Sequence, residues 1–418
     1  MQFRTARPGK TRTPGKRRTL AILGALCLFL STIEYLIPKP VPFMRIGIAN
    51  LPLMLALDIL PFGDFLLLTL IKVIGQGLVT GTLFSYILLF SLAGTFVSAL
   101  SMYALRRLLG PKRISMTGIS VAGALLSNAA QLVLARAFIF GTSVRYIVPP
   151  FLAMGAITGT ILGILCERFI GKSRWREKEL SPQGGENPAP ERKESPAPKA
   201  EDAKKKAGKG EQGRQKRREL YERMFSGREL CAAGILMLPA LAFNPSPYLR
   251  CAQFLFFLFL AWFAGKKNNL PITFAVILGI VAFNLLTPYG RILYSIGAFR
   301  ITEGALMGGL RRAATLEGLI MLSRFAIRRD LRLPGPLGEL IGESFRMLAL
   351  IQERRSAVSA KNFAAGIDAL LFELSETGDP SANAPLAPPR PISAAPGRVF
   401  LAAAVTLSWL SWLFIGRQ

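Results

Sequence analysis

A long charged segment divides this chain into two apolar parts, and it constrains the fold more than any other feature. Residues 171–227 are rich in Lys, Glu, Pro and Gly and contain almost no large apolar side chain away from their ends. Such a segment cannot bury enough apolar surface to offset the entropy of ordering it. We therefore expect two modules joined by a flexible cytoplasmic tether, and a coil of about 50 residues spans roughly 35–45 Å.

The composition places both modules in a lipid bilayer. Apolar residues make up 51% of the chain, and the net charge is +27. Lys and Arg gather in residues 1–18, in the tether and in short loops, which is typical of segments that stay in the cytoplasm. A strongly basic chain can also bind nucleic acid, but RNP-type aromatic motifs and zinc-ligand spacings are absent from the sequence. We expect a lipid bilayer around the chain and no nucleic acid partner.

The lengths of the apolar runs predict the helices that cross the membrane, since a crossing helix needs about 20 apolar residues. In the first module we expect spans near 19–37, 46–60, 63–80, 83–105, 115–139 and 147–170. In the second we expect spans near 229–243, 250–265, 270–287, 302–325 and 398–415. Basic loops at 106–113 and 172–176 then lie in the cytoplasm together with the N-terminus. The predicted fold class is an all-α integral membrane protein.

These features divide the chain into seven consecutive segments. They are a basic cytoplasmic tail (1–18), a six-span module (19–170), the charged tether (171–227), further spans (228–333), a cytoplasmic amphipathic segment (334–378), a Pro-rich linker (379–397) and a final span (398–418).

The amphipathic segment predicts two helices that neither cross the membrane nor leave it. Leu337, Leu340, Ile341 and Phe345 recur at helical spacing, with charged residues between them, and a second apolar stripe follows Ser359. Helices of this kind lie along a membrane face. They are either solvated surface helices or docking helices for a soluble partner.

Polar residues on the apolar spans indicate a substrate site in the outer half of the first module. A charge at the membrane midplane costs about 2.5–3.5 kcal/mol on insertion scales, so such residues are candidates for function. The candidates are Arg45, Asn50, Lys72, Gln76, Asn128, Gln131 and Arg136, and Glu34 lies near the same outer face. Lys72 or Arg136 suits an anionic substrate group. The alternative is that Lys72 reaches a lipid headgroup and the amides join helices.

The sequence offers no catalytic or metal-binding constellation. It contains no histidine, and its four cysteines show no CxxC spacing, so the commonest general base and the commonest transition-metal ligand are absent. The N-terminal PGKTRTPGKRRT lacks the spacing of a phosphate-binding loop. We therefore expect no enzyme activity and no cofactor in this chain, with any ATP bound by partner subunits.

Residues 20–170 resemble the Gx transporter family, also called heptaprenyl diphosphate synthase component I. The similarity lies in IEYLIPKPVPFMRIGIANLPLMLAL, LIKVIGQGLVTGTLFSYILLFSLAGTFVS and GISVAGALLSNAAQLVLA. It includes a Gly-x-Ala-Asn element ending at Asn50 and an Asn-x-x-Gln pair, Asn128 and Gln131. That family resembles the substrate-binding S components of energy-coupling factor (ECF) transporters. Residues 229–415 resemble the transmembrane T component, best at IGAFRITEGALMGGLRRAATLEGLIMLSR.

The resemblance implies roles for residues that couple the modules to an ATPase. S components use an Ala-x-x-x-Ala face against the T component, and Ala21 and Ala25 form such a pair, although packing within the first module is an equal alternative. T components carry two Ala-Arg-Gly motifs on coupling helices. The implied coupling residues here are Glu353, Arg354, Arg355, Ser356, Thr377 and Gly378. Arg355 takes the arginine position of the first motif and offers fixed donors to a carboxylate-lined groove. Threonine takes that position in the second motif and cannot do the same.

The sequence thus predicts a membrane subunit of an ECF-type ABC importer in the bacterial inner membrane. It would join a substrate-binding and a coupling module and take up a small molecule that is anionic, isoprenoid or vitamin-like. Cytoplasmic ABC ATPase subunits would be its partners. The alternatives are a non-catalytic accessory subunit of heptaprenyl diphosphate synthesis, since a DDxxD motif is absent, and a membrane scaffold.

Overall fold

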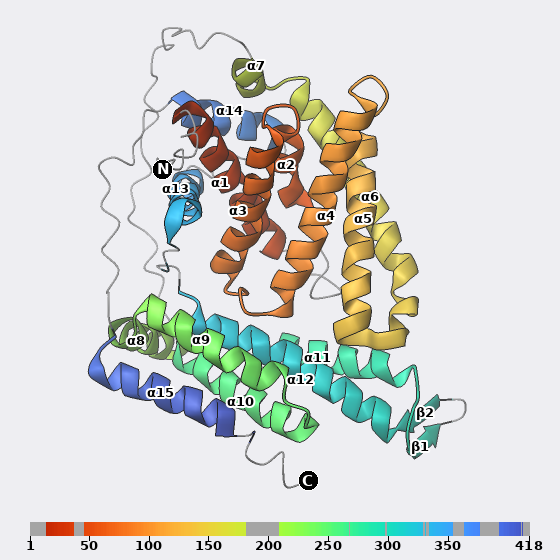
Figure 1. The fold of residues 1–418 in the computed structure, drawn as a ribbon, viewed down its shortest axis with the longest axis vertical. Helices are drawn as coiled ribbons and strands as arrows, with labels where there is room; N and C mark the ends of the chain where they lie inside the picture. The colour runs from red at the N-terminus through yellow and green to blue at the C-terminus, as the bar shows by residue number, and fades with distance from the viewer. Residues whose placement is uncertain are drawn as a thin grey trace, which may run out of the picture.

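The computed structural model describes residues 14–36, 46–180, 209–266, 268–296, 299–328, 331, 334–353, 363–376, 393–410 and 412. Two helix bundles make up this part of the chain, and the helices of the second run crosswise below those of the first (Figure 1).

The first bundle consists of long helices that lie side by side (Figure 1). They are α1 (Pro14–Leu36), α3 (Phe62–Thr80), α4 (Tyr86–Leu109), α5 (Met116–Ala135) and α6 (Val148–Ile170). A π-helical turn (Arg136–Phe140) and a 3-10 helix (Gly141–Tyr146) connect α5 to α6. The predicted spans at 63–80, 83–105, 115–139 and 147–170 agree with α3 to α6 within a few residues.

The predicted span at 46–60 was wrong. A 3-10 turn (Ile48–Asn50) is followed by α2 (Leu51–Ala56), which has only six residues and is about 9 Å long at 1.5 Å per residue. Its residues are all buried. The apolar run therefore reflects packing inside the bundle, where a short helix is sufficient, and not contact with lipid.

The second bundle contains four shorter apolar helices and a longer one. They are α9 (Gly227–Ala242), α10 (Pro247–Phe263), α11 (Leu270–Leu285), α12 (Glu303–Ala326) and α15 (Ala395–Leu410). The longer one, α12, is not among the helices apolar enough to cross a bilayer, although a span was predicted at 302–325. An antiparallel hairpin of β1 (Ile292–Ile296) and β2 (Phe299–Thr302) precedes α12. Apart from this hairpin the described elements are helices, in agreement with the predicted all-α class.

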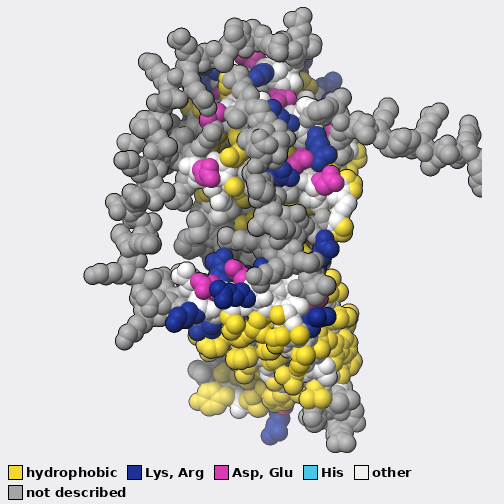
Figure 2. All heavy atoms as spheres, turned by 90° about the vertical axis from the view of Figure 1, so that its left-hand side faces the viewer, with side chains coloured by type: hydrophobic (Ala, Val, Ile, Leu, Met, Phe, Trp, Pro, Cys, Tyr) yellow, Lys and Arg dark blue, Asp and Glu magenta, His cyan; other side chains and the backbone are white. Residues whose placement is uncertain are grey.

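Long apolar helices make this a multi-pass membrane protein. Within the described residues, four helical segments are long and apolar enough to cross a bilayer, namely 62–80, 86–109, 116–146 and 148–170, and a bent pair at 213–242 would make a fifth. Large apolar side chains such as Val133, Ile161, Phe274 and Leu278 are at least 62% exposed, as expected for lipid contact. On the face shown in Figure 2, hydrophobic side chains form a broad patch on the lower part of the molecule, with several Lys and Arg side chains just above it.

Two amphipathic helices lie between α12 and α15 of the second bundle in the chain, but they pack on the first bundle. They are α13 (Gly335–Glu353) and α14 (Phe363–Glu376). Their buried apolar residues, such as Leu340, Leu348 and Leu370, share one core with Leu23 and Leu26 of α1. The helices form where the periodicity predicts them, but they bury their stripes against α1, α3, α6 and α7 instead of only against the membrane face.

The structure also differs from the sequence prediction at both ends of the tether. Helix α7 (Arg174–Leu180) and helix α8 (Lys209–Met224) form inside the segment predicted to be flexible. Trp175 of α7 is completely buried, and Tyr221 of α8 is buried and donates a hydrogen bond to the Phe325 carbonyl. Each end of the tether is therefore attached to one of the bundles.

Candidate functional site

A small polar pocket lies inside the first bundle. Its lining comes from α1, α3, α4, α5, α6 and the segment 46–50, and it consists of Glu34, Ile46, Gly47, Ala49, Asn50, Lys72, Gln76, Thr95, Ala124, Ser127, Asn128, Gly155 and Thr158. Its free volume is about 30 Å³, which is room for a few water molecules. In this conformation the lining side chains nearly fill the pocket.

Glu34 holds the segment that covers one side of the pocket. Its carboxylate accepts hydrogen bonds from the backbone N–H groups of Ile46 (2.9 Å) and Ala49 (3.3 Å). Between them, Gly47 has φ of 92°, a left-handed conformation that suits glycine. Sequence reasoning placed Glu34 at the outer face but left it out of the candidate set. The Gly-x-Ala-Asn element nearby was the available signal.

Lys72 brings a positive charge into the same pocket. It lies in the middle of α3, is 2% exposed, and donates a hydrogen bond to Asn50 Oδ1. Gln76 lines the pocket one helical turn later, as expected for residues four apart on one face. Lys72 therefore points into the bundle. This differs from the alternative interpretation of the sequence, in which Lys72 reaches a lipid headgroup.

Two amides on α5 approach neighbouring helices closely. Asn128 Nδ2 donates to the Phe151 carbonyl on α6 (2.8 Å), and Gln131 Nε2 donates to Ser127 Oγ (3.0 Å). Glycines at 155 and 94 make room, because a Cβ atom at either position would overlap an amide nitrogen. Asn128 thus joins two helices and also lines the pocket, whereas Gln131 lies just outside the lining with a buried Oε1 that accepts no hydrogen bond within the described residues.

The structure brings together four of the seven predicted substrate residues, namely Asn50, Lys72, Gln76 and Asn128. Gln131 is adjacent to them through Ser127. Arg136 is exposed at the start of the π-helical turn and is not part of the lining. Arg45 lies outside the described residues. The sequence analysis named Glu34 near the outer face but did not assign it to the site. It missed Thr95, Ser127 and Thr158 of the lining, since hydroxyl residues on a span give little signal of the direction in which they point.

The face of α1 that carries Ala21 and Ala25 is fully buried. Helix α1 packs on α13, where Ser344 lies so close to Gly24 that a Cβ atom at position 24 would meet its hydroxyl oxygen at 2.6 Å. Arg17 forms ion pairs with Glu343 (2.6 Å) and Glu339 (3.1 Å). Among the predicted coupling residues, Glu353 is exposed at the end of α13, and Arg354, Arg355, Ser356, Thr377 and Gly378 lie outside the described residues.

Asp368 of α14 attaches the start of the tether to this assembly. Its carboxylate accepts hydrogen bonds from Ser173 Oγ (2.5 Å) and from the N–H groups of Arg174 (3.0 Å) and Trp175 (3.3 Å). These donors lie at the start of α7. Asp368, on the distant helix α14, therefore caps the N-terminus of α7. Helix α14 is thereby joined to the end of α6.

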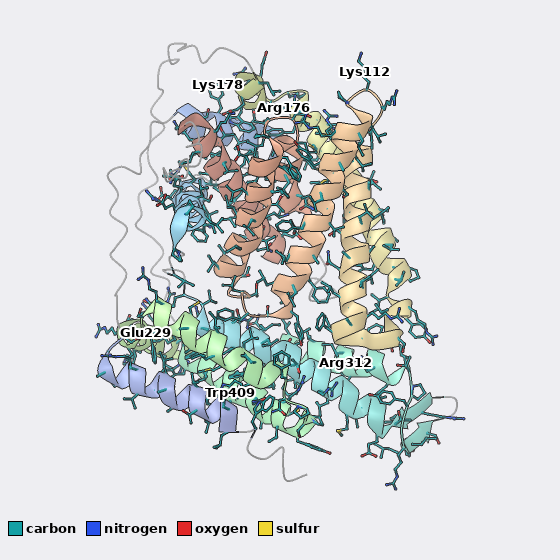
Figure 3. All side chains as sticks on the ribbon, viewed as in Figure 1. Lys112, Arg176, Lys178, Glu229, Arg312 and Trp409 are labelled. Carbon is teal, nitrogen blue, oxygen red and sulfur yellow. The ribbon has the colours of Figure 1, made fainter. Side chains whose placement is uncertain are left out.

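A second carboxylate at the same end of the bundle receives two arginines. Asp58 binds Arg106 (2.8 and 2.9 Å) and Arg176 of α7 (2.9 Å), and Figure 3 shows Arg176 at this end of the bundle. Burial acts to raise the pKa of Asp58, but the hydrogen bonds and charge of Arg106, followed by the charge of Arg176, outweigh it and hold the pKa below its ordinary value. The cluster links α7 to α4 and to the turn before α3.

At the opposite end of the first bundle, polar contacts join it to the second. Asn284 of α11 donates to the Ile139 carbonyl (3.1 Å) and accepts from Arg312 of α12 (2.7 Å), and Figure 3 shows Arg312 on α12 below α5. Ser143 and Thr287 share a hydrogen bond of 2.9 Å. Satisfied polar contacts between membrane helices stabilise their association.

In the part of the chain that the structure describes, no group of three or more His, Cys, Asp or Glu residues could hold a metal ion.

Comparison with known proteins divides the chain at the same place as the structure. Residues 23–169 match the family described as heptaprenyl diphosphate synthase component I, and residues 228–329 match a domain of unknown function (DUF8519). No curated protein and no solved structure matches the chain. The first match contains every residue of the pocket lining and agrees with the family resemblance of residues 20–170. The second coincides with α9 to α12 and is not a match to a T component.

Proposed function

We propose that this chain is the membrane subunit of an ECF-type ABC importer in the bacterial cytoplasmic membrane. The first bundle binds the substrate in the pocket around Lys72. The second bundle, with α13 and α14, couples that bundle to cytoplasmic ABC ATPase subunits. The chain itself catalyses no reaction and holds no cofactor, and its N-terminus faces the cytoplasm.

The crosswise arrangement of the two bundles carries this proposal (Figure 1). Membrane helices cross a bilayer within about 40° of its normal. Two bundles whose helices run crosswise cannot both cross the same bilayer in one state, although α3 to α6 are long and apolar enough to do so. On this proposal, the first bundle changes its orientation in the membrane, because an importer that moves its binding pocket from one side to the other needs such a change.

Helices α13 and α14 provide the connection through which such a motion is driven. They contact α1, which also contacts α3 of the pocket lining. A displacement of α13 would act on α1 through the Arg17 ion pairs and the Ser344 contact with Gly24. The pair Arg354 and Arg355, directly after α13, supplies the donors for an ATPase groove.

The name of the first family favours one other function. A heptaprenyl diphosphate synthase component would associate with a prenyltransferase instead of an ATPase. The polar lining of the pocket does not suit a long isoprenoid chain, because ligand sites for apolar molecules are lined mainly by hydrophobic and aromatic side chains. The identity of the soluble partner separates the two functions.

The experiment is affinity purification from native membranes, followed by assays of ATP hydrolysis and of prenyltransferase activity. We expect ATPase activity to co-purify with the wild-type chain and to fall by about tenfold or more in the double variant Arg354→Glu and Arg355→Glu, because charge reversal in a contact with carboxylates adds repulsion. The matched control reverses two exposed cytoplasmic charges elsewhere, Arg107→Glu and Lys112→Glu. Co-purified prenyltransferase activity, or ATPase binding that survives the Arg354 and Arg355 variant, would contradict the proposal.

A further inference from the structure

The pocket contains buried side chains of opposite charge. Glu34 is 5% exposed and Lys72 is 2% exposed, and both belong to the lining. A charge in a membrane-embedded bundle is costly and marks a functional site by default. The stability of the fold is a weak explanation for the presence of two buried charged side chains, because replacing buried ionic groups with apolar ones is often neutral or stabilising.

Both charged side chains contact the same short segment, residues 46–50. Glu34 binds two backbone N–H groups there, and Lys72 binds the Asn50 side chain. The carboxylate and the ammonium group therefore act on one shared space from α1 and α3. A ligand that enters this space meets an anionic side chain and a cationic side chain together.

The rest of the lining indicates a small hydrophilic ligand. Among the described residues the lining has no aromatic side chain, and Ile46 is its one large apolar residue. Six of the other ten lining residues carry a hydroxyl or an amide side chain, namely Asn50, Gln76, Thr95, Ser127, Asn128 and Thr158. Since the free volume is about 30 Å³, a ligand of more than a few atoms has to displace the contact between Lys72 and Asn50 as it binds.

We infer that the pocket binds a small hydrophilic zwitterion, with its anionic group at Lys72 and its cationic amine at Glu34. This inference rests on the proposed function, since it specifies the substrate class of the same pocket. It makes the substrate class predicted from the sequence more specific: the ligand carries an amine in addition to the expected anionic group. Glu34 repels a ligand that is only anionic, and Lys72 repels one that is only cationic.

Matched probes test the inference on the full-length wild-type protein in detergent. The probes are β-alanine with propionate and propylamine, and 4-aminobutyrate with butyrate and butylamine, each at equal ionic strength. We expect a zwitterion to raise the melting temperature saturably, as binding to the folded state requires, and its matched anion and cation to have no such effect. An anion or a cation that stabilises the protein as well as the zwitterion does would overturn the inference. So would the absence of any saturable effect of both zwitterions.

Two variants then assign the charges. Lys72→Met and Glu34→Gln should each weaken binding of the stabilising zwitterion by about tenfold or more, because each removes a hydrogen bond to a charged group. Arg136→Gln, exposed and outside the lining, should bind as the wild type does. If the variants do not fold, the comparison of probes on the wild type still decides. Zwitterion binding without a co-purified ATPase would refute the importer and leave the pocket in place, whereas a co-purified ATPase without zwitterion binding would refute this inference alone.

Discussion

At the scale of single residues, Asp58 shows how one carboxylate can join three segments. It binds Arg106 and Arg176, and all three side chains are at most 21% exposed. We expect Asp58→Asn to lower the free energy of unfolding by about 1–3 kcal/mol at neutral pH, since hydrogen bonds to charged groups contribute about this much. Because the pKa of Asp58 is lowered in the folded state, the stabilisation is fully present above the ordinary aspartate pKa of about 3.9 and is lost as the pH falls through the lowered value. Melting temperatures of wild type and variant between pH 3 and pH 7 should therefore converge below about pH 4. The exposed Glu219→Gln serves as a control, and a difference that stays constant down to pH 3 would contradict this role.

At the scale of elements, α7 depends on contacts from elsewhere in the chain. A helix of seven residues is too short to be stable alone, and it is held by the Asp368 cap, the buried Trp175 and the Arg176 ion pair. We expect Asp368→Ala to speed amide hydrogen exchange in residues 173–180 by roughly 2–30-fold, since loss of an N-cap costs about 0.5–2 kcal/mol. Ser375→Ala is the matched control on α14, because the Ser375 hydroxyl bonds only to its own helix. Unchanged exchange in α7 would show that Asp368 is dispensable.

The same elements show how far the sequence determines the fold. Helices α3 to α6 were predicted within a few residues, because the thickness of a bilayer sets the length of an apolar span. The segment at 46–60 and the helices α7 and α8 were not predicted, because their form depends on partners far away in sequence, such as Asp368 and Phe325. For the site, the presence of polar residues on apolar spans was sufficient to identify Lys72 and Asn128. Glu34 lines the pocket and Arg136 does not, because their side chains point in different directions. Directions of this kind follow from packing and are not set by spacing alone.

At the scale of the whole molecule, the lengths of the apolar runs could not predict that the bundles lie crosswise, because a run gives the length of a helix and not its direction (Figure 1). The proposed function requires the tether between the bundles to allow a change of orientation. We expect that removal of half of residues 181–208 leaves ATPase activity and substrate uptake nearly unchanged. The composition of this segment predicts a flexible tether, and halving such a loop changes its closure free energy by only about 0.6 kcal/mol. A stiff helical replacement of equal residue number should impair uptake. Uptake by reconstituted vesicles measures both, with a scrambled tether as control, and a severe loss on scrambling would assign the segment a binding role.

The packing of α13 and α14 on the first bundle has a consequence for biosynthesis. Helix α1 ends at Leu36, and the helix that covers it begins at Gly335. A ribosome that adds about 5–20 residues per second needs roughly 15–60 s to produce the intervening chain. Throughout that interval the apolar face of α1 has emerged without its final neighbour. Lipid, a chaperone or the insertion machinery therefore has to shield α1 until α13, in the last fifth of the sequence, is made, and a message truncated before α13 would yield a protein whose first bundle can never be completed.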